Sequence, residues 1–569
     1  MYNLCKLRRN AKVRPISAAE FSRMVESAQP PSGWSESLAV ANSGGPDSTC
    51  LLFLFDQLLK GPKDGGHKKL PRRLISLSID HGLQASSSLM AEHAAKTAQA
   101  LGVEHNTVTL PWGEGSNPPK PGPEDKIEEV ARAMRHRAFF NNMIANKANA
   151  LAMGHHIDDQ VETMLMRLGR GAHSYGLAGM RPCRRWGMGS HEDSYGADGL
   201  RRWIIRPLLR ESKDRILATC EENKLDYVND PTNFQPQLTV RNAIRHTIME
   251  GGTVATTASD PALAKFPPEI AKQLAEINVA AAKDPTLDFN LASSVEHLRE
   301  ANQSMVLERY RLEGEVDRII EEGRLQSPQG TFMVSVPTLM EIKSEDVKES
   351  LLYRIARYVS PEPWGNPRAE LGRREASMER LIKQLFAFKH LRAKNNISIV
   401  VGSGVWWKLV SLAKNQLRTA IKEVPLTSMA WIAVRQPRTA DKEDRPHNPL
   451  RVDLSDQLKE AIPRLGHHEP PHSALEVMYD CRFLMRFRMD KIPEDVVETL
   501  NNGGKLIVKP RSVFLLPQIL LVHRKKDKVV HSDIIKKPYF FPRDMGQKKD
   551  RTVTSDWITV EYFRPSTAI

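Results

Sequence analysis

A glycine-rich segment between two hydrophobic stretches has the residue types needed to hold a polyphosphate. Residues 43–48 read Ser-Gly-Gly-Pro-Asp-Ser, after the apolar run Leu38–Ala41 and before the helical pattern Thr49–Leu59. Adjacent glycines let the backbone turn sharply, so that its N–H groups can approach an anion. The following helix, for which Asp47 and Ser48 are suitable caps, points its positive dipole end at the same place. The segment predicts a phosphate-binding loop without the Gly-Lys-Ser/Thr of the Walker type, or else an ordinary strand–helix turn.

A second segment, residues 154–163, gathers carboxylates and imidazoles in the sequence Gly-His-His-Ile-Asp-Asp-Gln-Val-Glu-Thr. If a helix begins at Asp158, Glu162 lies one turn away from both Asp158 and Asp159. Such a cluster could hold a divalent cation beside a pyrophosphate, or it could bind a cationic substrate through paired carboxylates. Helix capping by the acids, together with a satisfied core histidine, is the structural alternative.

These segments belong to an alternation of predicted strands and helices. The strands are expected at 38–41, 73–82, 105–110, 150–153 and 201–209, and the helices at 49–59, 87–101, 124–148, 158–171 and 212–225. This order is typical of a parallel sheet with helices on both faces, in which ligands bind at the carboxyl ends of the strands. The glycine-rich loop, Asp80-His81-Gly82 and Gly154-His155-His156 each follow a strand. We therefore expect them to meet at one edge of the sheet and to form a nucleotide site.

The chain is too long for a single core, and its predicted fold class is α/β. We expect a parallel, doubly wound N-terminal domain, followed by a helical domain and a mixed α/β C-terminal region. A segment rich in Thr, Ala, Ser and Pro, residues 253–268, marks the first boundary, and residues 186–202 are predicted to be an exposed insertion. The expected divisions are a basic tail at 1–30, a catalytic domain at 31–250, a helical domain at 265–395 and the C-terminal region at 396–569.

Composition narrows the class of protein. A net charge of +14 and a pI near 9.4 suit a polyanionic partner such as RNA. No uncharged apolar run is long enough to span a bilayer, so we expect a soluble protein with no membrane partner. The five cysteines include no Cys-x-x-Cys pair, which argues against a disulfide framework, a structural zinc site or an iron–sulfur cluster. Residues 1–19 are basic and lack acids, which predicts a mitochondrial location, or otherwise a disordered tail on a cytoplasmic protein.

A series of motifs over about residues 35–250 resembles the tRNA(Ile)-lysidine synthetases, which belong to the N-type ATP pyrophosphatase, or PP-loop, superfamily. The matching motifs are residues 43–48, 80–82, 154–163, 170–171, 176–180, 206–209, 230–233 and 241–242. The resemblance implies an ATP-dependent ligase that forms a C–N bond. ATP adenylates the C2 carbonyl oxygen of the wobble cytidine in an isoleucine tRNA with a CAU anticodon. The ε-amine of free L-lysine then displaces AMP to give lysidine.

The resemblance also implies roles for individual residues. The implied ATP-binding residues are Ser43, Gly44, Gly45, Pro46, Asp47, Ser48, Asp80 and His81, and the implied lysine- or tRNA-binding residues are Arg132, Arg135, Asp159, Glu162, Arg170 and Arg241. Asp47, His155, Asp159 and Glu162 would be catalytic, and Asp47 and Asp158 would hold Mg²⁺. A solvated basic helix face is an equal alternative for Arg132 and Arg135.

Other functions compete with this interpretation. A tRNA thiolation enzyme on the same adenylating fold would need paired cysteines or a cluster, which the sequence lacks near the site. A metal-dependent phosphohydrolase using Asp80, His81, His155, His156, Asp158 and Asp159 would leave the glycine-rich loop unexplained. A catalytically inactive tRNA-binding scaffold is a third alternative. The basic and aromatic residues between 505 and 541 suit tRNA binding or solvated strand edges, and we do not recognise the bacterial accessory domains in this region.

Overall fold

The computed structural model describes most of the chain. The described residues are 13–61, 70–84, 86–115, 117–122, 127–172, 174–189, 195–252, 254–284, 286–366, 368–370, 375–386, 397–413, 416–418, 424–437, 449–462, 474–511, 514–525, 528–536 and 556–569. They form two compact units: residues 1–186 with 201–311, and residues 187–200 with 312–569. No helix in the described ranges is long and apolar enough to cross a membrane.

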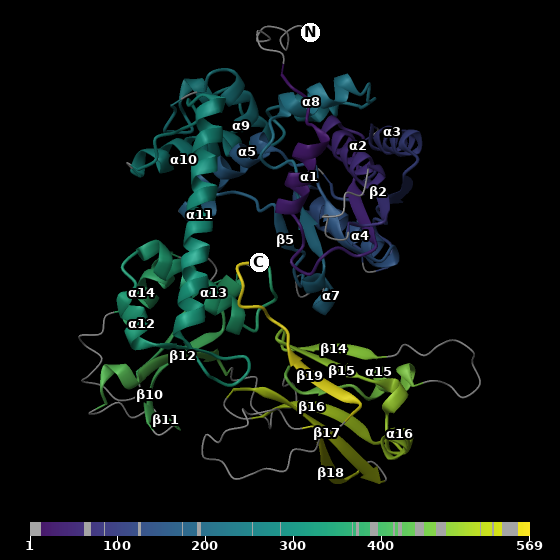
Figure 1. The fold of residues 1–569 in the computed structure, drawn as a ribbon, viewed down its shortest axis with the longest axis vertical. Coiled ribbons are helices and arrows are strands. Elements are labelled where there is room, and N and C mark those ends of the chain that lie inside the picture. The colour runs from purple at the N-terminus through teal and green to yellow at the C-terminus, as the bar shows by residue number, and fades with distance from the viewer. Residues whose placement is uncertain are drawn as a thin grey trace. The chain divides into compact units, whose positions relative to one another are not determined.

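The first unit, whose strands β2 and β5 are labelled in Figure 1, is built on a six-stranded sheet with the order β3-β2-β1-β4-β6-β5. Its strands are β1 (Ser37–Ala41), β2 (Arg73–Asp80), β3 (Glu104–Thr109), β4 (Ala148–Ala152), β5 (Cys183–Arg185) and β6 (Trp203–Ile205). All neighbouring pairs are parallel except β5 and β6, which are antiparallel. The predicted α/β fold with a parallel sheet is confirmed. The edge strand β5 was not predicted, because three residues are too few to show a period.

Helices connect the parallel strands and cover both faces of the sheet. The connecting helices are α2 (Pro46–Lys60), α3 (Ser86–Leu101), α4 (Ile127–Ala145) and α5 (Ile157–Leu168). Strand order runs outward from β1 to β3 and then returns to β4 on the other side of β1. Right-handed crossovers therefore place α2 and α3 on one face and α4 on the other. The strand order reverses between β1 and β4, which is where ligands of such sheets bind.

The N-terminal residues are only partly outside this fold. Residues 1–12, which carry most of the basic residues behind the mitochondrial prediction, lie outside the described residues. Helix α1 (Ala18–Ser27) begins at a capping box formed by Ser17 and Glu20. Phe21 and Val25 are buried, and the Phe21 ring packs edge-on against Phe55 of α2. The prediction of a basic tail over residues 1–30 is therefore wrong for the part from α1 onward, which belongs to the core.

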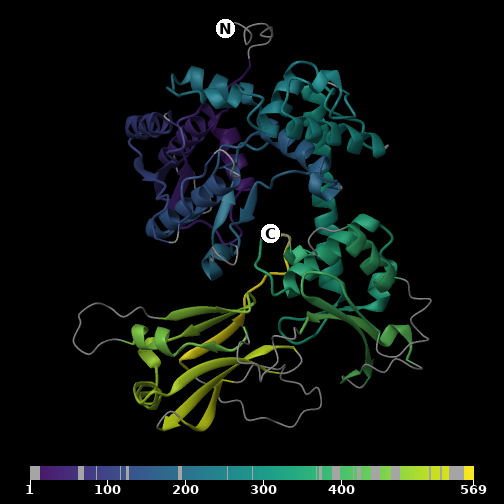
Figure 2. The same cartoon turned by 180° about the vertical axis from the view of Figure 1, so that it is seen from behind.

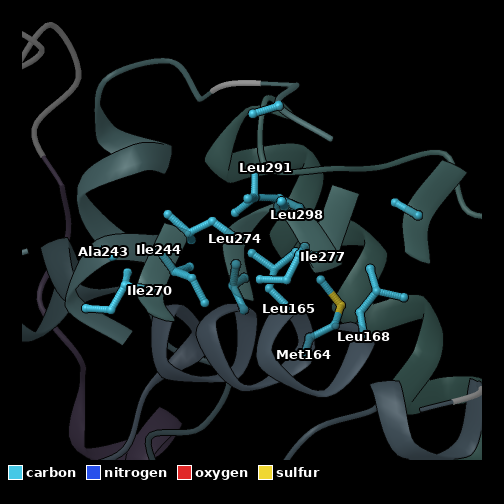
Figure 3. Close-up of a cluster of buried hydrophobic side chains, with 14 of the residues drawn as sticks. Met164, Leu165, Leu168, Ala243, Ile244, Ile270, Leu274, Ile277, Leu291 and Leu298 are labelled. Atoms are coloured by element: carbon cyan, nitrogen blue, oxygen red, sulfur yellow. The ribbon is translucent and has the colours of Figure 1, made fainter. Parts of the chain in front are cut away.

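The boundary predicted at residues 253–268 lies inside the first unit. The remaining helices of this unit are α6 (Ser174–Leu177), α8 (Lys213–Glu222), α9 (Val240–Met249), α10 (Pro268–Lys283) and the first part of α11 (Val295–Gly323). Figure 3 shows apolar side chains that join α5, α9, α10 and α11. Leu165 and Leu168 of α5 lie in one buried cluster with Leu274 and Ile277 of α10. Since α10 covers an apolar face of α5, the unit continues beyond residue 250.

The second unit combines helices with antiparallel sheets, so residues 265–395 do not form one helical domain (Figure 2). Its sheets have the orders β11-β10-β12-β8-β7, with β9 on β10, then β13-β16-β17-β18, and β14-β15-β19. The strands are β7 (Arg324–Leu325), β8 (Phe332–Ser335), β9 (Ser398–Val400), β10 (Val405–Ala413), β11 (Gln416–Arg418), β12 (Met429–Arg435), β13 (Val452–Asp453), β14 (Leu475–Tyr479), β15 (Phe483–Phe487), β16 (Lys505–Arg511), β17 (Leu516–Lys525), β18 (Lys528–Lys536) and β19 (Ile558–Tyr562). The helices are α12 (Val336–Glu341), α13 (Glu345–Val359), α14 (Glu375–Phe386), α15 (Ser455–Ala461) and α16 (Glu494–Asn501).

The segment 187–200, predicted to be an exposed insertion, belongs to this second unit. Met188 and Leu200 are buried against Trp364, and the Met188 N–H donates to the Trp364 carbonyl at 2.9 Å. Helix α7 (Gly196–Arg201) then leads the chain back to β6. The prediction failed because the polar and glycine-rich residues around Met188 hid its apolar anchor. Residues 537–555, which include the predicted aromatic residues near 540, lie outside the described residues.

Candidate functional site

The predicted phosphate-binding loop lies between β1 and α2. Gly44 has a φ of +77°, and a Cβ atom there would lie 2.9 Å from the Met90 carbonyl oxygen, so glycine is required. Helix α2 begins at Pro46 with Gly45 as its N-cap. The prediction that Asp47 and Ser48 cap this helix is therefore wrong. Ser48 instead donates to the Gly45 carbonyl at 3.0 Å and accepts from the Ser43 N–H at 3.1 Å.

Asn42, which the sequence analysis missed, shapes this loop from beneath. Its Oδ1 accepts hydrogen bonds from the Gly44 N–H at 3.0 Å and the Ser48 hydroxyl at 3.2 Å. Its Nδ2 donates to the Ser76 hydroxyl and to the Ala94 carbonyl. Asn42 is buried, and its amide thereby ties the loop to β2 and α3. The sequence does contain a signal for this role, because Asn42 is a polar residue between the apolar strand and the glycine pair.

The end of β4 approaches this loop closely. A Cβ atom on Gly154 would lie 2.9 Å from the carbonyl carbon and oxygen of Asp47, so only glycine allows this approach. His156 is the N-cap residue of α5, and its Nε2 lies 3.6 Å from an oxygen of both Asp47 and Asp159. The structure therefore brings the two predicted motifs together, at the switch point between β1 and β4.

Two basic residues outside both motifs complete the acidic cluster. Lys213 Nζ lies 2.6 Å from Asp47 Oδ1, and the Arg299 guanidinium lies 2.6 Å from Asp158 Oδ1. These are the two predicted Mg²⁺ ligands, and each is already ion-paired. The described chain also holds no group of three or more His, Cys, Asp or Glu residues arranged as metal ligands. The residues as arranged do not fit a protein-held Mg²⁺ ion. Arg299 was missed because it lies beyond the expected domain boundary.

The carboxylates of Asp159 and Glu162 share one turn of α5 and face α9. Asp159 Oδ2 accepts the N–H of His156 at 3.0 Å. Glu162 Oε1 accepts from Arg245 Nε at 2.7 Å, and its Oε2 lies 3.5 Å from Arg241 Nε. Arg241 is also 4.0 Å from Asp159. The predicted residues Asp159, Glu162 and Arg241 therefore meet, while Arg245, one helical turn after Arg241, was missed despite its matching spacing.

Burial and neighbouring charges together set the protonation of Glu162, Asp159 and His155. Burial raises the pKa of Glu162 to about 7, against the opposing charge of Arg245 and with support from the negative charge of Asp159. Burial would also raise the pKa of Asp159, but His156 and His155 outweigh it and lower that pKa to about 2. Burial, followed by the charge of Arg206, lowers the pKa of His155 to about 3. The site thus holds an ionised Asp159 beside a neutral His155 at neutral pH.

Asp80 and His81 follow β2, on the other side of β1 from β4. Asp80 accepts hydrogen bonds from the Ser87 hydroxyl at 2.7 Å, from the Gly82 N–H at 3.0 Å and from the Ser88 hydroxyl at 3.0 Å. Burial would raise the pKa of Asp80, but these hydrogen bonds outweigh it and lower the pKa. Asp80 is therefore placed as a support of the loop from β2 into α3, and these hydrogen bonds join it to Gly82, Ser87 and Ser88 and not to residues 43–48.

The predicted arginines are not all at the site. Arg132 and Arg135 are exposed on α4, and after burial the charge of Arg135 is the next cause that lowers the pKa of His81. Arg170 is exposed beyond the C-terminal end of α5. At 1.5 Å per residue, it lies roughly 15 Å along the helix from Asp159. The structure therefore does not bring Arg170 to the carboxylate pair.

Comparison with known proteins agrees with this arrangement. Residues 16–251 match the model of the PP-loop domain family. The tRNA(Ile)-lysidine synthase of Methylobacterium nodulans is 32% identical over 280 residues, which cover 48% of this chain and 70% of that protein. The enzymes of the same name from Bradyrhizobium sp. and Bacillus subtilis are 35% and 31% identical, over 43% of this chain and 59% and 44% of their own lengths.

Likeness to solved structures is weaker. The U34-tRNA thiolase NcsA from Methanococcus maripaludis has a TM-score of 0.33 at 16% identity, over 52% of this chain and 78% of that chain. The assignment therefore rests on the sequence relatives and on the motifs that meet at the switch point. Because it shares 32% identity over 70% of the Methylobacterium nodulans protein, this chain belongs to the tRNA(Ile)-lysidine synthase family.

Proposed function

We propose that the protein is an ATP-dependent ligase that converts the wobble cytidine of a CAU-anticodon isoleucine tRNA into lysidine, with free L-lysine as the second substrate. The observation that carries the proposal is the juxtaposition of the glycine-rich loop with the Asp159–Glu162 pair at the reversal of strand order. The glycine-rich loop suits a polyphosphate, and the carboxylate pair suits an amine.

In the first step, the cytidine O2 attacks the α-phosphorus of ATP, the bond between the α and β phosphates breaks, and pyrophosphate leaves. The loop at residues 43–48 suits this leaving group, because it is formed around positive φ at Gly44 and opens onto the start of α2. The ammonium group of Lys213, which is ion-paired with Asp47 of the loop, adds a positive charge beside the leaving group. Mg²⁺ would enter with the phosphates of ATP, whose charge it would offset.

In the second step, the lysine ε-amine attacks C2, the C2–O bond to the adenylate breaks, and AMP leaves with its electron pair. The amine must lose a proton, and a carboxylate is a suitable acceptor. Asp159 is ionised at neutral pH and suits the binding of an ammonium group. Glu162, whose pKa is near 7, suits proton transfer at physiological pH. His155 is neutral, and its buried Nδ1 has no hydrogen-bond partner in the described residues, so it can bind a polar edge of the base.

The thiolation alternative is disfavoured by the state of the buried cysteines. Cys220 contacts the Pro46 carbonyl at 3.6 Å, and its hydrogen bond with Cys50, together with burial, raises the pKa of Cys50. Cys183 in β5 is buried, and burial raises its pKa to about 12. A thiol with so high a pKa is not a thiolate at neutral pH, and thiolates are the reactive form. The mitochondrial location expected from residues 1–19 stays a prediction, since the relatives found are bacterial.

The test is incorporation of radiolabelled lysine into a CAU-anticodon isoleucine tRNA in the presence of ATP and Mg²⁺. We expect Asp159→Asn to lower the rate on the order of 10²-fold or more, because it removes the ionised carboxylate. Asp288→Asn, which makes the same change at an exposed aspartate outside the acidic cluster, is the matched control. ATP–pyrophosphate exchange with tRNA, without lysine incorporation by the wild type, would overturn the choice of lysine as the nucleophile.

A further inference from the structure

Three arginines gather beyond β4, on the side away from the glycine-rich loop. Arg206 directly follows β6, Arg184 lies in β5, and Arg132 lies in the first half of α4. The Arg206 side chain is 5% exposed; its Nη1 donates to the Arg181 carbonyl at 3.0 Å, while its buried Nε has no hydrogen-bond partner in the described chain. Arg184 Nη1 donates to the carbonyls of Arg185 and Trp186. Main-chain carbonyls thus hold two guanidinium groups in place.

The positive charge of this arginine cluster is uncompensated. Within the part of the chain that the structure describes, no carboxylate is ion-paired with Arg132, Arg184 or Arg206. Burial lowers the pKa of Arg206 to about 9, and the charges of Arg184 and Arg132 are the next causes. Burial and then Arg132 lower the pKa of Arg184 to about 10. Buried like charges without a counter-ion are costly, so such a cluster is the arrangement expected of an anion site.

The sheet order separates this cluster from the glycine-rich loop that is proposed to bind the polyphosphate. Strand β4 lies between β1 and β6, so the loop after β1 and the arginine cluster flank the strand end that carries His155. Arg206 is close enough to His155 to lower its pKa, second only to burial. The loop proposed to bind the polyphosphate lies on the β1 side of β4. The cluster therefore faces the part of the second substrate that lies on the β6 side of His155.

We propose that Arg132, Arg184 and Arg206 bind a backbone phosphodiester of the RNA, next to the nucleotide whose base lies at His155. This inference rests on the proposed function for the identity of the RNA. Exposure falls from Arg132, which is open to solvent, through Arg184 to the buried Arg206, and this suits a polymer that enters from the surface. The two non-bridging oxygens of a phosphodiester, which share one negative charge, match the paired N–H groups of a guanidinium. Fixing the backbone also helps to hold a base that has left its stack.

The test measures binding alone, so that it does not depend on turnover. The probe is an RNA anticodon stem-loop with a CAU anticodon, titrated with the full chain at several salt concentrations without ATP or lysine. We expect Arg132→Met and Arg184→Met each to weaken binding several-fold and to reduce the slope of log K against log salt by about 0.7–0.9. Arg73→Met is the matched control, because Arg73 is a half-exposed arginine at the start of β2, paired with Glu104 at the opposite edge of the sheet.

Two further RNA probes each carry one neutral methylphosphonate, on the 5′ side of the target cytidine in one probe and on the 3′ side in the other. One of the two positions should remove the difference between wild type and Arg184→Met, which identifies the phosphate. Unchanged affinity and salt slope in both variants would overturn the proposal. A raised KM for lysine with unchanged RNA binding would overturn it too, since the anion would then be the lysine carboxylate. If the wild type forms no lysidine but the RNA-binding results are as expected, the proposed function is overturned and the phosphodiester site is not.

Discussion

At the scale of single residues, Glu162 is a carboxylate whose burial moves its pKa into the physiological range. Its usual pKa is 4.5, and burial raises this to about 7 although Arg245 lies 2.7 Å away. Between these pH values the folded protein holds a proton that the unfolded chain has released. The free energy of unfolding therefore falls as the pH rises through this window, and it levels off above it.

Replacing Glu162 with Gln removes this titration. We expect the wild type and Glu162→Gln to have similar urea midpoints near pH 5, where Glu162 is protonated in the fold, and the wild type to lose stability relative to the variant by pH 8. Urea unfolding at both pH values measures this, with Glu345→Gln, an exposed glutamate at the start of α13, as the control. A relative gain by the wild type would mean that the charges of Arg241 and Arg245 outweigh burial.

Gly154 provides a second prediction at this scale. In Gly154→Ala the new Cβ atom would press on the backbone of Asp47, so the phosphate-binding loop must shift. We expect a loss of about 1–3 kcal/mol in the free energy of unfolding, as for other overpacked sites, and weaker ATP binding. Isothermal titration with ATP checks the second effect. Gly314→Ala is the control, because Gly314 lies in α11 with nothing within 4 Å of its Cβ position, and it should be neutral or slightly stabilising.

At the scale of elements, α10 extends the first unit beyond the boundary predicted at residues 253–268. Its fully buried Leu274 lies in the cluster that also contains Leu165 of α5, the helix that carries Asp159 and Glu162 (Figure 3). We expect Leu274→Ala to lower the free energy of unfolding by about 2–5 kcal/mol. Leu307→Ala, at a 66% exposed position of α11, should change it by less than about 0.5 kcal/mol. Chemical denaturation distinguishes them, and equal effects would mean that α10 is not part of this core.

The same elements show what the sequence could predict. The strands and the motifs after them follow local rules of period and glycine chemistry, so residues 43–48 and 154–163 could be located and assigned to one edge. Lys213 and Arg299 could not, because their roles come from tertiary contacts that no local pattern records. Asn42 and Arg245 had a local signal, in the position before the glycines and in the spacing from Arg241, but their hydrogen-bond partners come from the fold. The Thr/Ser/Pro-rich residues near 260 resemble a linker, yet Leu263 and Phe266 among them are buried in the core. Composition alone does not show which loops are packed.

At the scale of the whole molecule, the segment 187–200 makes the two units depend on each other. Met188 and Leu200 are buried against Trp364, which lies in the sequence after residue 311. A chain that ends at Arg311 should therefore expose both apolar side chains and aggregate. Light scattering should show this, and the double substitution Met188→Ser and Leu200→Ser should restore a monodisperse fragment. If the unmodified fragment is already monodisperse, the segment does not need the second unit.

The chain passes between the two units at residues 186/187, 200/201 and 311/312. A domain acquired by simple fusion at a gene terminus would be joined once. The second unit therefore cannot be deleted, exchanged or transplanted with a single cut, because part of it is encoded inside the catalytic sequence, between the edge strand β5 and its neighbour β6. Recombination at the 311/312 junction alone would separate Trp364 from its partners, so this architecture is inherited as a whole or rebuilt at both places.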